Sequence, residues 1–274
     1  NDLPSHEEIE GALKYLKNNK AAGSDSISAE LLKNGGPNLV DALHEMIQQA
    51  WTSETLPESW TKGVLCPVFK KGDKLDCANY RGICLLNVAY KVFAKILNDR
   101  LLPYANAVVQ HYQAGFQSGK STTDQLFTLR QILEKGNEYN IPTHHLFIDF
   151  KAAYDTIIRN EVYVSMLELD FPTKLIRLTK ATLSTVLCCV KIQNDCSEYF
   201  ETRQGLRQGD VLSTLLFNVV LEIIVRRAKL QTNGTIFNKQ TQILAYADDI
   251  EIIGRNQVAA REVLLASERE ANKV

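Results

Sequence analysis

Two adjacent carboxylates lie between apolar, β-branched runs near the carboxyl end of the 274-residue sequence. Residues 246–249 read Tyr-Ala-Asp-Asp, and the flanking runs predict a tight β-hairpin with Asp248 and Asp249 at its tip. Like charges side by side are unfavourable unless a cation lies beside them. Mg²⁺ is such a cation, because it binds one or two carboxylates together with substrate phosphates. Taken alone, the tetrapeptide is explained equally well by a surface turn, where Asp is common.

A third carboxylate, Asp149, follows the apolar run Leu-Phe-Ile at residues 146–148, which predicts a short strand ending at the aspartate. Three carboxylates on two neighbouring strand ends can hold two metal ions about 3.5–4 Å apart, as nucleotidyl transfer requires. One ion would lower the pKa of the attacking hydroxyl, and the other would stabilise the leaving pyrophosphate. For Asp149 alone, a strand-end cap is the alternative explanation.

A glycine-containing loop at residues 205–213 precedes a strongly apolar segment. Glycine lets backbone approach a substrate closely, and the start of a helix favours negative ligands. By itself, however, a loop of this kind is more often just a turn.

These residues must be positioned by a chain that mixes helices and strands. Pro103 is expected to end the helix before it, and a capping-box pattern at Ser5 to begin the first helix. The predicted helices cover residues 27–32, 37–51, 88–102, 123–138, 160–169, 173–183, 213–230 and 258–272. Strands are expected at 64–69, 146–149, 186–193 and 197–202, with a turn at 194–195. This order predicts an α+β sheet with helices on one face.

Composition is that of an ordinary globular protein, with 45% hydrophobic and 23% charged residues and a net charge of −1. Residues 60–135 carry 11 Lys and Arg against 5 Asp and Glu, leaving the remainder acidic. A basic segment of this kind suits phosphate binding, although a solvated surface explains it too. No apolar run is long enough for a membrane span. Six cysteines without zinc-ligand spacing predict buried free thiols in a reducing, intracellular compartment.

The motifs together carry a family resemblance. Asp149 with Tyr154, the Arg-Gln-Gly loop at 207–209 with Ser213, and Tyr-Ala-Asp-Asp stand in the order of reverse transcriptase motifs. The chain resembles the polymerase domain of a LINE-type, non-LTR retrotransposon. Further blocks of that subgroup are matched at residues 20–25, 69–73, 79–83 and 113–125. Six blocks in order are far less expected by chance than any single motif.

The resemblance implies a right-hand polymerase fold, with a helical N-terminal extension at 1–59, fingers at 60–143 and a palm at 144–274. The palm would be an antiparallel sheet backed by helices. The sequence does not start with a methionine and it stops inside a helical pattern, so both ends look like cuts through a longer polypeptide. Compared with the family pattern, the later palm motifs, the thumb and an endonuclease are missing.

The resemblance also implies residue roles. The metal ligands would be Asp149, Asp248, Asp249 and the carbonyl of Phe150. Tyr154 would lie beneath the incoming sugar, where its bulk excludes a 2′-hydroxyl; core packing is the alternative. The incoming nucleotide would be bound by Lys70, Arg81, Gln208 and Gly209, with Lys71 replacing Lys70 if the register differs. The template backbone would be bound by Gly115, Gln117, Lys120 and Ser121.

The implied reaction is two-metal addition of dNTPs to a DNA primer on an RNA template, with Mg²⁺, or Mn²⁺ in its place, during retrotransposition in the nucleus. Three departures bear on activity: Ser24 replaces the usual proline, Gln117 an arginine and Thr214 a proline. They leave open a catalytically inactive or co-opted remnant that only binds nucleic acid. An RNA-dependent RNA polymerase is a third reading, which Tyr154 disfavours. The sequence gives no oligomeric state.

Overall fold

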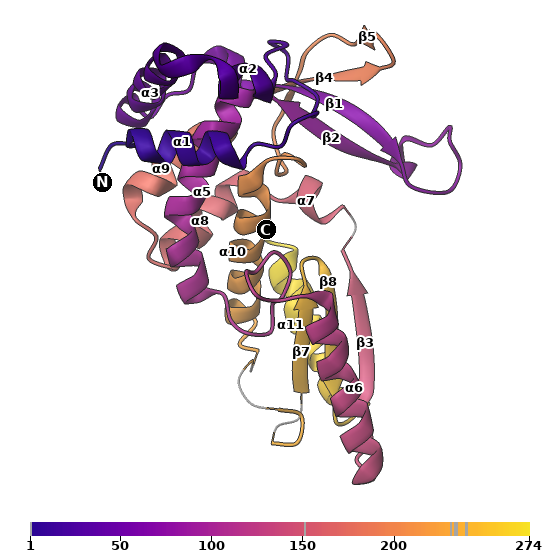
Figure 1. Cartoon of the computed structure of the whole chain (residues 1–274). Coiled ribbons are helices and arrows are strands. Elements are labelled where there is room, and N and C mark those ends of the chain that lie inside the picture. Colours follow the sequence, from indigo (N-terminus) through magenta and orange to yellow (C-terminus); the bar gives the residue numbers. More distant parts are fainter. Residues whose placement is uncertain (1, 151, 231, 233–234, 239–240) are drawn as a thin grey trace. The chain divides into compact units, whose positions relative to one another are not determined.

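Two compact units make up the chain in the computed structural model, which describes residues 2–150, 152–230, 232, 235–238 and 241–274 (Figure 1). Unit 1 comprises Asn1–Pro103 and Asp170–Ser213, and unit 2 comprises Tyr104–Leu169 and Thr214–Val274. Each unit combines helices with a β-sheet, so the predicted α+β class is confirmed.

Unit 1 begins with a helix whose start the sequence predicts closely. The Ser5 side chain accepts a hydrogen bond from the Glu8 amide, and the Glu8 carboxylate accepts one from the Ser5 amide, so the capping box is confirmed. The helices of this unit are α1 (His6–Tyr15), α2 (Ala29–Asn34), α3 (Gly36–Ser53), α4 (Glu58–Thr61), the short 3₁₀ turn η1 (Cys77–Asn79), most of α5 (Val88–Val108), and α9 (Thr173–Leu183).

The helix α5 contradicts one prediction. Pro103 does not end it, because the helix continues for five residues beyond the proline. Pro103 itself is exposed, whereas Leu101 and Ala105 on either side are buried. Packing of these neighbours compensates for the backbone hydrogen bond that proline cannot donate.

The sheet of unit 1 has the strand order β2-β1-β4-β5, with β6 also paired to β4. Its strands are β1 (Lys62–Phe69), β2 (Tyr80–Leu86), β4 (Val186–Ile192), β5 (Asp195–Cys196) and β6 (Phe200–Thr202). β1 and β4 are parallel and the other pairs antiparallel. The sequence predicted one sheet containing the 186–202 hairpin and the strand before Asp149. That prediction is wrong, since the buried apolar part of β4 pairs instead with β1.

The predicted hairpin at 186–202 also differs in detail. Its turn lies at residues 193–194, one position earlier than expected, and the returning strand is split into β5 and β6. The predicted buried thiols are confirmed for Cys84, Cys188 and Cys189. Cys77 and Cys196 are exposed instead, and all six cysteines are free.

Unit 2 is built on a three-stranded antiparallel sheet of order β3-β8-β7. The strands are β3 (His144–Asp149), β7 (Thr241–Tyr246) and β8 (Asp249–Gly254), and the helices are α6 (Thr122–Glu138), α7 (Ala153–Thr156), α8 (Arg159–Glu168), most of α10 (Val211–Arg227) and α11 (Gln257–Ala271). α6 packs beside β7, and α11 packs on all three strands (Figure 1). A core cluster of Ile132, Leu244, Ile253 and Ile236 fixes the inward faces of β7 and β8.

The helix α10 is apolar on all sides and buried along most of its length, as expected for a central helix. None of the helices in the described part of the chain is long and apolar enough to span a membrane.

Candidate active site

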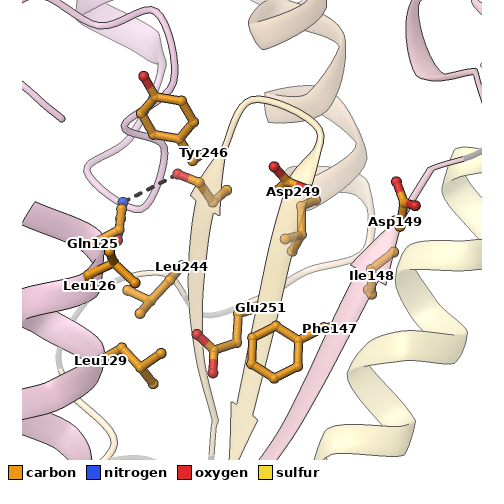
Figure 2. Close-up of a pocket in the computed structure, with 12 residues that line it drawn as sticks. Gln125, Leu126, Leu129, Phe147, Ile148, Asp149, Leu244, Tyr246, Asp249 and Glu251 are labelled. Carbon is orange, nitrogen blue, oxygen red and sulfur yellow. Dashed lines mark hydrogen bonds between the residues drawn. The ribbon is translucent and has the colours of Figure 1, made fainter. Parts of the chain in front are cut away.

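The register between β3 and β8 brings two of the predicted carboxylates together. Asp149 is the last residue of β3, Asp249 is the first residue of β8, and the two are directly paired across the antiparallel ladder. Figure 2 shows both carboxylates at the same end of the sheet, and both residues are exposed. Like charges directly opposite each other destabilise a sheet, so a cation bound between them would relieve the repulsion.

The third carboxylate lies in the turn that joins β7 to β8. Tyr246 pairs with Asp249, so the turn residues are Ala247 and Asp248. The hairpin is confirmed, but its tip is Ala-Asp rather than Asp-Asp. Ala247 has φ of +57°, the left-handed conformation that tight two-residue hairpin turns require. Among the described residues no set of three or more His, Cys, Asp or Glu side chains is arranged as a metal cluster.

Tyr154 lies near the Asp248 turn. Its ring stacks on Phe217 of α10, with centroids 4.7 Å apart. Burial, and secondarily the Asp248 carboxylate, raises the pKa of the Tyr154 phenol. The phenol oxygen is buried and has no hydrogen-bond partner within the described part of the chain. Since buried hydroxyls are normally paired, this oxygen is available to a bound molecule.

Below the carboxylates, a mostly apolar cavity of about 250 Å³ lies between α6 and the sheet (Figure 2). Asp149 and Asp249 border it, and Phe147, two residues before Asp149 on the same face of β3, is 71% exposed. Glu251 also lines the cavity, and its carboxylate lies 2.7 Å from Nδ1 of His145. His145 therefore has a specific partner on the neighbouring strand β8.

The four residues predicted to bind the template lie between α5 and α6, and three have roles within the fold. Ser121 is the N-cap of α6 and accepts a hydrogen bond from the Asp124 amide. Lys120 donates from Nζ to the Gln113 carbonyl at 2.8 Å, and burial lowers the pKa of this ammonium. Gly115 is buried against the Ala247 turn. Gln117 is half-buried.

Of the predicted nucleotide-binding residues, Tyr154 lies in unit 2, and the other four lie in unit 1. Lys70 and Arg81 are exposed where β1 and β2 meet their connecting loop. In the loop before α10, the Gln208 carbonyl accepts a hydrogen bond of 2.7 Å from the Cys84 amide. Gly209 has φ of +113°, and a Cβ there would lie 2.8 Å from the Cys84 carbonyl oxygen. Glycine is therefore required for this close approach.

A buried ionic cluster supports that loop, and the sequence did not predict it. Arg207 lies 3.2 Å from the Asp210 carboxylate and its guanidinium stacks 4.4 Å from the Tyr90 ring centroid. Tyr90 donates its hydroxyl to Asp210 at 2.5 Å. Buried charges need such pairing. The Arg-x-x-Asp spacing is the only local signal, because Tyr90 lies 120 residues away in the sequence.

Within unit 2 the structure thus brings together the carboxylates, Tyr154 and the segment holding the predicted template residues. Phe150, whose carbonyl was predicted to bind metal, follows Asp149 and is half-buried. Lys70 and Arg81 share one hairpin of unit 1, and Gln208 and Gly209 pack on the strand that contains Arg81.

Comparison with known proteins gives a consistent result. The family described as "Reverse transcriptase (RNA-dependent DNA polymerase)" matches residues 68–274. The chain is 24% identical to the "Transposon TX1 uncharacterized 149 kDa protein" of Xenopus laevis, over 92% of the chain and 20% of that protein. It is 25% identical to the "Probable RNA-directed DNA polymerase from transposon BS" of Drosophila melanogaster, over 78% of the chain and 24% of the relative.

A third relative is the "Retrovirus-related Pol polyprotein from type-1 retrotransposable element R2" of Popillia japonica, 24% identical over 93% of the chain and 35% of its own length. The chain therefore spans about a fifth to a third of these relatives. The resemblance to LINE-type retrotransposon proteins is confirmed.

Proposed function

Because the chain belongs to the reverse transcriptase family, we propose that it carries the catalytic centre of an RNA-directed DNA polymerase that serves retrotransposition. The observation that supports this most directly is the pairing of Asp149 with Asp249 beside the Asp248 turn. This arrangement places three carboxylates at one end of a sheet, where two of them are exposed.

Asp149, Asp248 and Asp249, with the carbonyl of Phe150, would hold two Mg²⁺ ions, and Mn²⁺ could take their place. The donor set fits, because Mg²⁺ favours carboxylate oxygens together with substrate phosphates. When bound, the ions would neutralise phosphate charge and activate the primer hydroxyl. The protein's own contribution would be to hold Asp149 and Asp249 on paired strands, with Asp248 in the adjoining turn.

The incoming dNTP would be selected and oriented by the chain. Tyr154 is proposed to lie under the sugar, and its buried hydroxyl, which has no partner among the described residues, supports contact with a ligand. Lys70 and Arg81 are exposed cations available to the triphosphate, and Gln208 and Gly209 would contact the nucleotide and the templating base.

An RNA template and a DNA primer are the proposed macromolecular partners. Gly115, Gln117, Lys120 and Ser121 are proposed to follow the template backbone. We further propose the right-hand arrangement, with an N-terminal extension at 1–59, fingers at 60–143 and palm at 144–274, and action in the nucleus.

Primer extension on an RNA template tests the proposal. With Mg²⁺ present, we expect the intact polypeptide to incorporate dNTPs, and Asp248→Asn to reduce incorporation at least about 100-fold. The matched control is Asp195→Asn on the exposed strand β5, which should not change the rate. Chelation of the metal should abolish incorporation, and Mg²⁺ should restore it.

Two results would contradict the proposal. One is incorporation that survives Asp248→Asn. The other is retention of RNA without any nucleotide incorporation by the unchanged protein, which would instead support a remnant that only binds nucleic acid.

A further inference from the structure

The turn that carries Asp248 needs support from outside its own hairpin. Ala247 is 5% exposed and has a left-handed φ of +57°, which is unfavourable for a residue with a Cβ. It lies between β7 and β8, outside their ladder, so its amide and carbonyl lack ladder partners. Buried backbone groups of this kind require partners elsewhere in the protein.

One side chain, Gln113, supplies both partners. Its Oε1 accepts a hydrogen bond of 2.8 Å from the Ala247 amide, and its Nε2 donates one of 3.2 Å to the Ala247 carbonyl. The same Oε1 accepts a 2.7 Å hydrogen bond from the Gly115 amide. Gln113 is fully buried, so water does not compete for these bonds. A side-chain amide carries an accepting oxygen and a donating nitrogen, so it satisfies both groups at once without a charge.

The backbone around Gln113 is itself held against the hairpin. The Ala245 amide donates to the Tyr112 carbonyl, and the Ala114 amide donates to the Ala245 carbonyl, both at 2.9 Å. Gln125 of α6 donates from Nε2 to the Tyr112 and Ala245 carbonyls at 3.0 and 3.3 Å, the latter drawn as the dashed line in Figure 2. Gln113 is therefore presented to the turn from a fixed edge of the sheet.

Gly115 makes the approach feasible. A Cβ at this position would lie 2.1 Å from the Ala247 nitrogen, so any other residue would displace the turn. The Gly115 carbonyl in turn accepts a 2.9 Å hydrogen bond from Asn218 of α10. The turn is thus connected through Gln113 and Gly115 to the central helix of unit 2.

We propose that Gln113 is a positioning residue, which holds the Ala247–Asp248 turn so that Asp248 and Asp249 present their carboxylates for metal binding. This proposal rests on the proposed polymerase function. Residues that orient metal ligands in this way affect metal affinity by about 10- to 100-fold when they are replaced.

The test compares two variants. Gln113→Met has a side chain of similar size but removes all three hydrogen bonds, whereas Gln113→Glu keeps oxygens that can accept them. Gln131→Met on α6 is the matched control, since Gln131 bonds only its neighbour Glu134 among the described contacts. All are made in the intact polypeptide.

Three measurements are made on each variant: hydrogen exchange of the Ala247 amide, Mn²⁺ affinity by electron paramagnetic resonance, and the Mg²⁺ concentration for half-maximal primer extension. For Gln113→Met we expect about tenfold or faster exchange and metal affinity about tenfold weaker, with the KM for dNTP nearly unchanged. In Gln113→Glu the Ala247 amide should exchange more slowly than in Gln113→Met. If Gln113→Met does not fold, the three measurements are made on Gln113→Glu instead. General destabilisation would lower kcat without changing the metal requirement.

Wild-type exchange or wild-type metal affinity in Gln113→Met would overturn the positioning role. If the unchanged protein incorporates no nucleotide, the polymerase proposal fails instead. Hydrogen exchange and Mn²⁺ affinity then still decide whether Gln113 positions the carboxylates.

Discussion

Tyr154 is a single residue that both packs in the fold and lies beside the candidate metal ligand Asp248. Its ring is fixed against Phe217, while its hydroxyl is buried without a partner in the described structure. A side chain held this firmly beside Asp248 can exclude a substituent from a bound sugar, because the packed ring cannot move aside.

Replacing Tyr154 by valine should therefore weaken the discrimination between dNTP and NTP by at least about tenfold, through an increased kcat/KM for NTP. Tyr154→Phe keeps the ring and should keep the discrimination. The measurement is single-nucleotide primer extension with each nucleotide. Unchanged discrimination in the valine variant would show that Tyr154 is only a packing residue.

The residues that could be predicted from the sequence are those whose signal is local. Asp149, Asp248 and Asp249 each stand beside an apolar run, so their location at the ends of strands or in the connecting turn follows from the local sequence. Gln113 gave no such signal. Its main partner, Ala247, lies 134 residues away, and the family block at 113–125 that begins with Gln113 does not show what its side chain contacts.

At the scale of elements, local chemistry fixes helix boundaries better than it fixes strand partners. The capping box at Ser5 and the segment forming α9 have the predicted positions, since caps and apolar periodicity act within a few residues. The pairing of β4 with β1 was not predictable, because an apolar strand pattern does not specify which other strand it joins.

Pro103 shows how packing can override a local rule, and it yields a stability prediction. The proline is exposed inside α5, where it contributes no backbone donor. Pro103→Ala should restore that hydrogen bond and raise the free energy of unfolding by about 1–2 kcal/mol, after the greater freedom of the unfolded chain is subtracted.

Denaturant unfolding monitored by circular dichroism measures this change. Pro172→Ala is the control, because Pro172 is the N-cap of α9 and interrupts no helical hydrogen bond. An unchanged or lower midpoint for Pro103→Ala would mean that the proline shapes α5 in a way its packing needs.

At the scale of the whole molecule, each compact unit is assembled from two chain segments that are distant in sequence. Local patterns carry no information about such assembly, so the contacts that join the segments are found only in the structure. In unit 1, one of these contacts is ionic. Glu54, at the end of α3, accepts hydrogen bonds from Lys174 at 2.8 Å and from Arg177 at 2.6 Å, both on α9.

These contacts give unit 1 a stability that depends on pH. Hydrogen bonds from Arg177 and then Lys174 lower the pKa of Glu54 from the ordinary 4.5 to about 2. Because its pKa is lowered in the folded state, the Glu54 carboxylate stabilises that state fully above pH 4.5. This contribution is lost as the pH falls towards about 2.

Glu54→Gln should therefore lower the free energy of unfolding near pH 7 by up to about 1 kcal/mol. The deficit should shrink between pH 4.5 and 2, as denaturant titrations at each pH would measure. Glu45→Gln, on the exposed face of the same helix, should show no such deficit. A deficit for Glu54→Gln that stays constant as the pH falls would mean that its charge does not hold the two segments together.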